Sequence, residues 1–240
     1  MNRPRITPSV IPNLFTAINM FCGFYSIVET ANGNYNYSAW LIFVAALFDA
    51  LDGIVARLTG SSSELGVELD SLSDIVSFGA APAFILYKTY FIQFDVFGII
   101  LASLPMIAGG FRLARFNVQL VGFEKSFFIG LPIPSAALTI ASYILAFYNN
   151  GFESPYDQLV IPLVLLVSVL MISNIRYETL PKFSFEGIKE KPFHFLFLLL
   201  SLIAIILFYK QGIFYTFVFM IAIGIFRHIY YMLGKKSDAE

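Results

Sequence analysis

Four aspartates lie within two neighbouring apolar stretches of this sequence. Asp49 and Asp52 are three residues apart in one stretch, and Asp70 and Asp74 are four residues apart in the next. In a helix, either spacing places both carboxylates on one face. Carboxylate oxygens are the preferred ligands of hard divalent cations. Four of them on adjacent helices could hold two metal ions about 3.5–4 Å apart, the arrangement that clamps a phosphoryl group during transfer.

Acidic side chains in apolar stretches need a partner. Inserting one carboxylate into a membrane costs roughly 2.5–3.5 kcal/mol, so four would cost on the order of 10–14 kcal/mol if the costs add. Metal ions could offset this cost. One alternative is that the acids sit at helix ends and pair with Arg57, Arg112 and Arg115. The stronger alternative is the cation site of a transporter, because intramembrane acids also mark ion pathways.

Two small residues and an arginine favour a phosphorylated ligand over a transported ion. Gly53 and Ala56 follow Asp49 by four and seven residues, which places them on the same helix face. Small residues let a bulky ligand lie against the backbone, although they also line helix–helix interfaces. Arg57 adds a cation that is suited to phosphate oxygens.

The composition indicates a membrane protein. Of the 240 residues, 58% are hydrophobic and 13% are charged, whereas soluble domains carry roughly 25% charged residues. The net charge of −1 argues against nucleic-acid binding. The single cysteine, Cys22, excludes an internal disulfide and a thiolate metal cluster. Only two histidines, His194 and His228, are present, which argues against a zinc site of the usual kind.

Eight apolar segments approach or exceed the length of roughly 20 residues that crosses a bilayer as a helix. Turn-forming residues separate several of them, as at Asn32-Gly33-Asn34 and at Gly60-Ser61-Ser62-Ser63. We therefore expect an all-α polytopic membrane protein. The expected segments are residues 10–30, 37–58, 67–90, 95–115, 132–149, 156–174, 193–209 and 211–232.

The basic residues indicate an orientation. If the N-terminus lies inside and the segments alternate, every one of the 15 Lys and Arg residues except Lys88 and Lys210 lies on the inner side. Such an excess marks the cytoplasmic side of membrane proteins. We therefore expect both termini in the cytoplasm.

The same orientation places the acids at one depth. Asp49 and Asp52 would lie about 9–14 Å from the cytoplasmic end of the second segment, and Asp70 and Asp74 about 5–11 Å into the third. A short loop makes these two helices neighbours. We therefore expect the four carboxylates to converge on a cavity that faces the cytoplasm.

The spacing of these residues resembles a family signature. Asp49-x2-Asp52-Gly53-x2-Ala56-Arg57-x8-Gly66-x3-Asp70-x3-Asp74 is similar to that of the CDP-alcohol phosphatidyltransferases at all eight positions. Further stretches resemble the bacterial and archaeal phosphatidylserine synthases of that family, whose core is shared by phosphatidylcholine and phosphatidylinositol-phosphate synthases. The stretches that carry this second resemblance are residues 12–16, 71–83, 112–117, 130–134 and 173–177.

The resemblance implies a fold and a reaction. It implies a core of six transmembrane helices, here residues 1–177, usually in a homodimer. Residues 178–240 would add about two transmembrane helices and a short cytoplasmic tail. The implied reaction transfers a phosphatidyl group from CDP-diacylglycerol to L-serine and releases CMP, with two Mg²⁺ or Mn²⁺ ions. Inositol phosphate, glycerol phosphate or choline as acceptor remains an alternative, as does, more distantly, a cation-coupled transporter.

The resemblance also implies roles for single residues. Asp49, Asp52 and Asp70 would bind the first metal ion, and Asp49 or Asp70, together with Asp74, the second. Asp74 is also the candidate general base. The residues expected to contact CDP-diacylglycerol are Asn13, Thr16, Gly53, Ala56, Arg57 and Gly66. For Asn13 and Thr16, ordinary hydrogen bonding between helices is an equal alternative.

Arg112 and Arg115 are candidates for binding the acceptor. They lie three residues apart at the expected cytoplasmic end of the fourth segment. One interpretation is that they anchor the helix beside lipid headgroups. The other is that they receive the carboxylate or phosphate of the acceptor as bidentate donors. The two arginines alone do not distinguish among acceptors.

Overall fold

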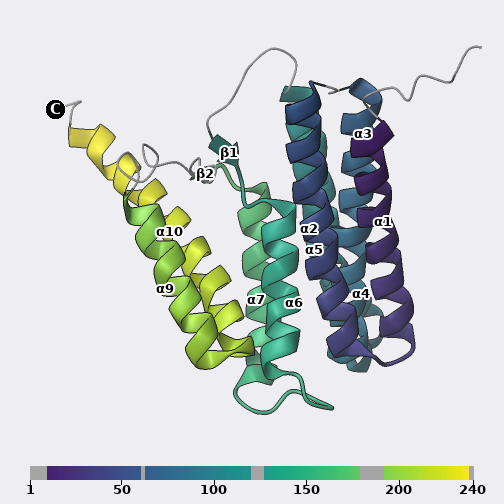
Figure 1. Cartoon of the computed structure of the whole chain (residues 1–240). Coiled ribbons are helices and arrows are strands. Elements are labelled where there is room, and N and C mark those ends of the chain that lie inside the picture. The colour runs from purple at the N-terminus through teal and green to yellow at the C-terminus, as the bar shows by residue number, and fades with distance from the viewer. Residues whose placement is uncertain (1–9, 61–62, 120–126, 179–191, 238–240) are drawn as a thin grey trace, which may run out of the picture.

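The computed structural model describes residues 10–60, 63–119, 127–178 and 192–237. Nearly all of this chain is helical, and the helices lie roughly parallel or antiparallel to one another (Figure 1). The α-helices are α1 (Val10–Ala31), α2 (Tyr35–Thr59), α3 (Glu64–Asp74), α4 (Ala81–Thr89), α5 (Asp95–Gln119), α6 (Ile133–Phe147), α7 (Tyr156–Ile172), α9 (Pro192–Phe208) and α10 (Lys210–Ser237).

The third transmembrane segment consists of α3, a π-helix and α4. A π-helix, η1 (Ile75–Ala80), joins α3 to α4 without a break, so that residues 64–89 form one helical segment. A short 3₁₀ turn, η2 (Phe91–Phe94), then leads into α5. The sequence analysis predicted one helix here, but it did not predict the change of winding.

The helices are long and apolar enough for a multi-pass membrane protein. Five helical stretches meet the length and hydropathy of a membrane span: Val10–Ala31, Tyr35–Thr59, Glu64–Thr89, Phe91–Val118 and Lys210–Tyr230. Three shorter apolar helices are α6, α7 and the Leu199–Phe208 part of α9. The predicted all-α polytopic fold is confirmed, and each of the eight predicted segments corresponds to one of these helical stretches.

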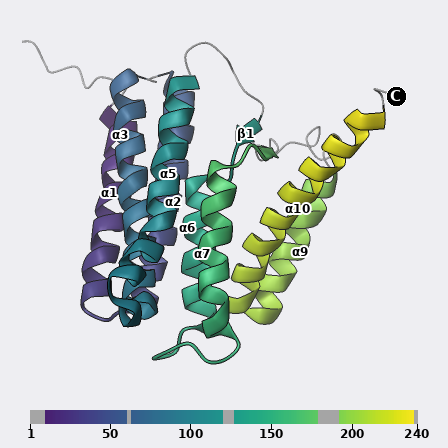
Figure 2. The ribbon, with the colours of Figure 1, turned by 180° about the vertical axis from the view of Figure 1, so that it is seen from behind.

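Gly60 lies in the turn between α2 and α3, and the end of the bundle with this turn is here called the Gly60 end. At this Gly60 end α1 begins and α10 ends (Figure 1). Helices α1 to α5 form one side of the molecule, α6 and α7 lie beside them, and the α9–α10 hairpin lies at the far edge, as the reverse view also shows (Figure 2). Helix α1 packs against both α2 and α3, so it touches the two helices that carry the aspartates.

Local signals explain the turn between α2 and α3. Gly60 adopts φ 61°, and its N–H donates to the carbonyl of Ala56, which ends α2 in the left-handed conformation that suits glycine. Ser63 then caps α3, because its hydroxyl accepts a hydrogen bond of 3.0 Å from the Gly66 N–H. These two caps return the chain alongside α2 within a few residues.

A short ribbon at the Gly60 end was not predicted. Strand β1 (Phe127–Ile129) pairs antiparallel with β2 (Arg176–Glu178). The main chain that follows β1 also bonds the region around the end of α7, because the Gly130 N–H donates to Ile175 O and the Leu131 N–H to Leu170 O. The expectation of an all-α chain therefore missed these two three-residue strands.

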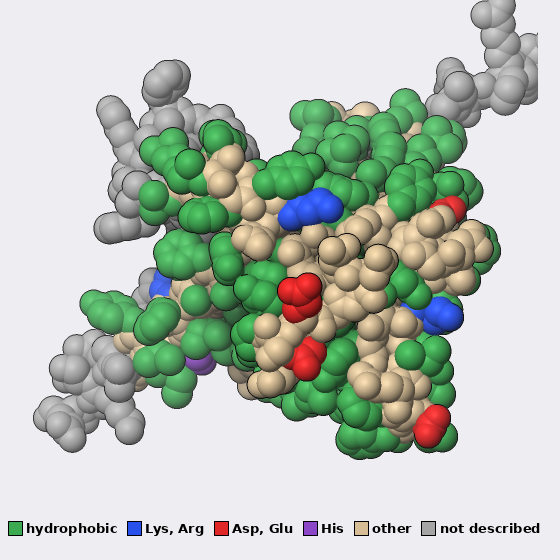
Figure 3. Space-filling view, turned by 90° about the horizontal axis from the view of Figure 1, so that it is seen from below, with side chains coloured by type: hydrophobic (Ala, Val, Ile, Leu, Met, Phe, Trp, Pro, Cys, Tyr) green, Lys and Arg blue, Asp and Glu red, His purple; other side chains and the backbone are tan. Residues whose placement is uncertain are grey.

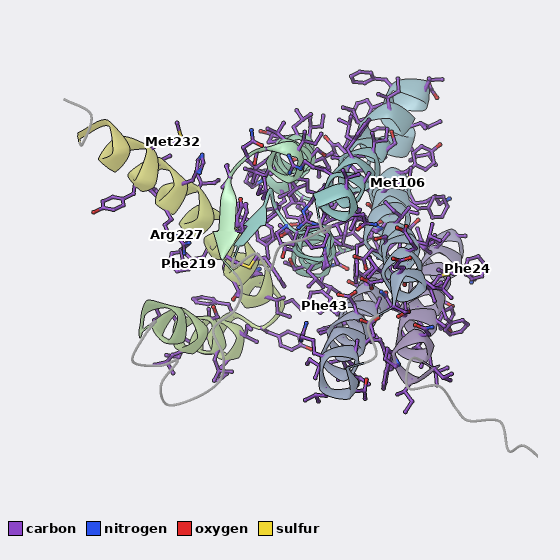
Figure 4. All side chains as sticks on the ribbon, turned by 90° about the horizontal axis from the view of Figure 1, so that it is seen from above. Phe24, Phe43, Met106, Phe219, Arg227 and Met232 are labelled. Atoms are coloured by element: carbon purple, nitrogen blue, oxygen red, sulfur yellow. The ribbon has the colours of Figure 1, made fainter. Side chains whose placement is uncertain are left out.

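Aromatic contacts dock α10 on the bundle at the end opposite Gly60. The ring of Phe214 on α10 lies 5.2 Å from that of Tyr143 and 5.3 Å from that of Phe147 on α6, both in edge contact. Phe43 of α2 and Phe217 of α10 are also in contact. Viewed from the Gly60 end, Phe24 of α1 and Met232 of α10 lie at opposite edges of the molecule (Figure 4). Packing of this kind, rather than exclusion from water, holds helices together in a membrane.

Truncation of Phe214 tests this docking. We expect Phe214→Ala to lower the stability of the protein in detergent by about 2 kcal/mol, or roughly 4–8 °C in melting temperature, because both edge contacts are lost. The matched control is Phe226→Ala, since Phe226 on the same helix is 74% exposed. Equal melting temperatures for the two variants would show that Phe214 does not dock α10.

Candidate metal and substrate site

Three carboxylates from two helices meet inside the apolar bundle. Asp49 of α2 and Asp70 and Asp74 of α3 each offer one oxygen, and these oxygens all lie within 4.8 Å of one another. Asp74 is buried, with 6% of its surface exposed, and the other two are half-buried. Asp49 and Asp74 are within hydrogen-bonding reach of each other. The turn at Gly60 therefore brings acids 21 to 25 positions apart in the sequence to one place.

Asp52 lies beside this group but has a partner of its own. Its Oδ2 accepts a hydrogen bond of 2.8 Å from the hydroxyl of Thr16 on α1. The side chain is 7% exposed. Its charge still interacts with those of Asp49 and Asp70, so it faces the same region. Thr16 thus fixes one oxygen of Asp52, an interaction between helices that the sequence analysis had left as an alternative to nucleotide binding.

The donor set fits a divalent metal ion. Oδ1 of Asp70 and Oδ1 of Asp74 are buried and have no hydrogen-bond partner among the described residues. A buried carboxylate oxygen without a partner is strongly unfavourable. Carboxylates this close also repel one another, and surroundings of low polarity strengthen that repulsion. A hard cation ligated by oxygen relieves both effects, and Mg²⁺ or Mn²⁺ is of that kind.

Hydrogen bonds to α1 hold α3 and η1 in place beside the acids. The Ser73 hydroxyl donates to the carbonyl of Thr16 at 3.1 Å, and the Ser77 hydroxyl donates to the carbonyl of Asn19 at 2.8 Å. Ser73 and Ser77 are completely buried. The sequence analysis gave no role to these serines, although both belong to the 71–83 stretch that carried the second resemblance.

The small residues predicted to face the donor leave space along α2. A Cβ on Gly53 would meet only the guanidinium of Arg57, 3.6 Å away. Ala56 is half-buried and Arg57 is exposed. On the neighbouring helices, a Cβ on Gly66 would lie 3.4 Å from Oδ1 of Asn13. The structure thus places Asn13 beside Gly66 at the Gly60 end.

The two predicted acceptor residues have different surroundings. Arg112 is buried, with 6% exposed, and its charge interacts with that of Asp74. Arg115 instead donates to three main-chain carbonyls: Ile129 O and Ile172 O at 3.1 Å, and Ser173 O at 3.3 Å. Arg115 therefore joins α5 to β1 and to the end of α7, whereas Arg112 is buried where its charge interacts with that of Asp74.

A further contact between α3 and α5 was not anticipated. The Asn117 amide donates to the hydroxyl of Ser71 at 2.9 Å. Asn117 ends the 112–117 stretch that begins with Arg112, and Ser71 follows Asp70 directly. Periodicity had placed both stretches on helices, but it carries no information on which side chains meet across them.

Two adjoining hollows lie at the end of the bundle opposite the Gly60 end, and neither is lined by Asp49, Asp70 or Asp74. They have volumes of about 370 and 350 Å³, and both are lined by Asn36, Tyr148 and Asn149. Figure 3 shows this end, where charged side chains are scattered among polar and hydrophobic ones. None of the site residues predicted from the sequence lines either hollow.

Comparisons with known proteins agree with the signature. Residues 9–172 match the family model described as CDP-alcohol phosphatidyltransferase. The chain is 38% identical over 174 residues to a CDP-diacylglycerol–serine O-phosphatidyltransferase of Helicobacter pylori, covering 72% of this chain and 73% of that protein. It is 43% identical over 180 residues to the archaetidylserine synthase of Methanothermobacter thermautotrophicus, covering 74% and 73%.

A third relative is covered over almost its whole length. The CDP-diacylglycerol–serine O-phosphatidyltransferase of Bacillus subtilis is 31% identical over 185 residues, which are 75% of this chain and 96% of that protein. The matched region includes all four aspartates and the three arginines of the candidate site, Arg57, Arg112 and Arg115. On the family model and these identities, the chain belongs to the CDP-alcohol phosphatidyltransferase family.

Proposed function

We propose that the chain transfers the phosphatidyl group of CDP-diacylglycerol to the hydroxyl of L-serine, which yields phosphatidylserine and CMP. The observation that carries the proposal is the group of Asp49, Asp70 and Asp74, which combines the family signature with oxygens within 4.8 Å. Relatives named for phosphatidylserine and archaetidylserine share serine as acceptor and differ in the lipid. The names thus support serine more directly than they support diacylglycerol as the lipid of the donor.

The carboxylates would hold two Mg²⁺ or Mn²⁺ ions. We assign Asp49, Asp52 and Asp70 to the first ion, and Asp74, with Asp49 or Asp70, to the second. When bound, such ions polarise a pyrophosphate and stabilise the charge on a departing nucleotide. The hydrogen bond from Thr16 orients Asp52 for this role, as outer hydrogen bonds do for metal ligands in general.

Asp74 would act as the general base. It accepts the proton of the serine hydroxyl, and the hydroxyl oxygen attacks the phosphorus that bears diacylglycerol. The bond from this phosphorus to the oxygen of CMP breaks, and CMP leaves. The buried position of Asp74, whose charge interacts with that of Arg112, supports this role.

Arg112 would bind the carboxylate of serine directly. A guanidinium can donate two parallel hydrogen bonds to a carboxylate, and Arg112 is the arginine whose charge interacts with Asp74. Arg115 would act mainly through the carbonyls that it holds at the ends of β1 and α7. The sequence analysis gave acceptor binding to both arginines, whereas this assignment gives it to Arg112 and a supporting role to Arg115.

The donor would bind at the Gly60 end. Its nucleotide would contact residues from α1, α2 and α3, and its acyl chains would remain in the bilayer. Gly53 and Ala56 offer space along α2, and Arg57 offers a cation for the phosphates. The remaining contacts would come from Asn13, Thr16 and Gly66.

We also propose the cellular arrangement of the protein. The site would face the cytoplasm with both termini on that side, because the basic residues Arg57, Arg112 and Arg115 gather at the Gly60 end. Residues 1–177 would form the catalytic core and residues 178–240 an added C-terminal part, in keeping with the family match at 9–172. The protein would act as a homodimer and bind no nucleic acid.

The decisive experiment follows CMP release from CDP-diacylglycerol by purified protein with Mg²⁺ or Mn²⁺. Each acceptor is added singly. Metal-dependent release with serine alone is the expected result. Release only with inositol phosphate, glycerol phosphate or choline would keep the family reaction and replace the acceptor. Cation flux in liposomes without CMP release would instead support a transporter.

Loss of one carboxylate should stop the reaction. We expect Asp49→Ala and Asp70→Ala to lower the rate of CMP release to about one hundredth or less, because each removes a proposed metal ligand. The control is Asp95→Asn at the exposed start of α5, which removes an acidic charge outside the carboxylate group and keeps the size of the side chain. Near-normal turnover in either alanine variant would overturn the two-metal assignment.

Lysine substitutions separate the roles of the two arginines. Arg112→Lys should raise the KM for serine about tenfold or more and leave the KM for CDP-diacylglycerol nearly unchanged, because lysine cannot form the bidentate pair. Arg115→Lys should mainly lower the melting temperature, because three carbonyls lose their shared donor. A serine KM raised equally in both variants, with Arg115→Lys as stable as the unmodified protein, would show that Arg115 binds the acceptor itself.

A further inference from the structure

The helix that carries Asp70 and Asp74 changes its winding directly after Asp74. The π-helix η1 occupies Ile75–Ala80, between two ordinary α-helical stretches. π-helices account for well under 1% of residues, and they occur frequently at functional sites. Because each π turn contains an extra residue, the side-chain faces of α3 and α4 do not continue one another. The face that carries Asp70 and Asp74 is therefore rotated relative to the face by which α4 packs.

Contacts with α1 define the face that α3 and η1 present. Ser73 and Ser77 donate to two carbonyls on α1, those of Thr16 and Asn19. The two donors are four residues apart on one helix, and the two acceptors are three residues apart on the other, so the bonds lie one turn from each other. All four residues are at most 3% exposed. A pair of buried bonds one turn apart resists both rotation and sliding of one helix against the other.

Gly23 continues this line of contact by one further turn. A Cβ at Gly23 would lie 2.5 Å from the Cα of Ser77 and would also collide with its hydroxyl. The backbones of α1 and η1 therefore approach so closely that no side chain fits at position 23, as at other glycine contacts between membrane helices. Thr16, Asn19, Gly23, Ser73 and Ser77 are here called the α1 seam.

The α1 seam is connected to the carboxylates on both helices. On α3, Ser73 directly precedes Asp74 and follows Asp70 by three residues. On α2, Asp52 accepts its hydrogen bond from Thr16, whose carbonyl is also the acceptor for Ser73. One residue of α1 thus holds a carboxylate of α2 and the backbone position of α3 at the same time.

From these contacts we propose that the α1 seam sets the spacing of the metal-binding carboxylates, with Ser77 and Gly23 as positioning residues. Neither residue contributes a ligand. Each fixes the rotation and distance of α3 and η1 relative to α1, and Thr16 links α1 to Asp52. Loss of either contact lets Asp70 and Asp74 move relative to Asp49 and Asp52, which weakens metal binding. The inference rests on the metal-binding part of the proposed function.

The test measures metal binding through thermal stability, without turnover. The melting temperature of the purified full-length chain is followed against the concentration of Mn²⁺ alone, since a ligand that binds only the folded state raises it. We expect Ser77→Ala to raise the half-saturating Mn²⁺ concentration roughly threefold to tenfold, which corresponds to one hydrogen bond. Gly23→Ala should have a larger effect, because its Cβ forces the helices apart.

Two control variants match these changes. Ser168→Ala removes a buried hydroxyl that bonds only within α7. Gly110→Ala adds a methyl group on α5 that faces η1 at an ordinary distance, 3.6 Å from Ile75 Cδ1. Both should keep the half-saturating Mn²⁺ concentration of the unmodified protein, even if their melting temperatures change.

The outcomes separate this inference from the proposed function. Equal half-saturation in Ser77→Ala, Ser168→Ala and the unmodified protein would overturn the positioning role and leave the α1 seam as packing only. If Gly23→Ala does not fold, Ser77→Ala decides alone. No effect of Mn²⁺ on the unmodified protein would overturn the inference. A normal effect of Mn²⁺ without CMP release would overturn only the proposed reaction.

Discussion

Mutual repulsion among buried carboxylates is the constraint around which this bundle is organised. Three carboxylate oxygens lie within 4.8 Å of one another, and the helices around them are apolar. Surroundings of low polarity strengthen the repulsion, so the bundle must hold the helices together where the charges drive them apart. A tight turn at Gly60 does so along the chain, and α1 does so across it, because it bonds to both α2 and α3.

Local pattern was sufficient for the transmembrane segments and for the faces of the acids. Apolar runs and turn residues predicted the eight segments, and spacings of three and four residues predicted that each pair of aspartates shares a face. The family was likewise evident from residues at fixed spacing, and the family match confirmed it. These features depend on neighbours in the sequence, which periodicity describes well. The roles of single residues remain predictions.

Contacts between distant segments were not accessible in the same way. Arg115 donates to carbonyls of residues that follow it by 14 to 58 positions. Because every residue has a main-chain carbonyl, the sequence does not show which residues accept these bonds. The same holds for the bonds from Ser73 and Ser77 to α1. The π turn has no composition that would distinguish it from an α-helix. The sequence analysis considered a hydrogen bond from Thr16 to another helix, but it did not identify Asp52 as the acceptor. The spacing of the four aspartates does not show which of them has a partner of its own.

The short ribbon connects the family core to the C-terminal hairpin. Tyr177 of β2 lies against Gly224 of α10, where any larger residue would collide with its ring. Burial raises the pKa of the Tyr177 phenol to about 12. Because Arg115 holds the other strand of the ribbon through Ile129, α10 contacts the same small structure that the arginine supports. The hairpin is thereby joined to the core at both ends of the bundle.

In both hydrogen bonds from the serines of the third segment to the carbonyls of α1, the donor lies on the third segment. Both donors are serine side chains, whereas both acceptors are carbonyl oxygens of the main chain. A carbonyl is supplied by every amino acid, so the acceptor at position 19 remains after a substitution that keeps the helix and fits the completely buried site of Asn19. The hydrogen bond therefore constrains the residue type at positions 73 and 77 but not at position 19, where complete burial sets the limit instead. On α1, the residue type is constrained elsewhere: at Gly23 by the close approach of the two helices, and at Thr16 by its own hydrogen bond to Asp52.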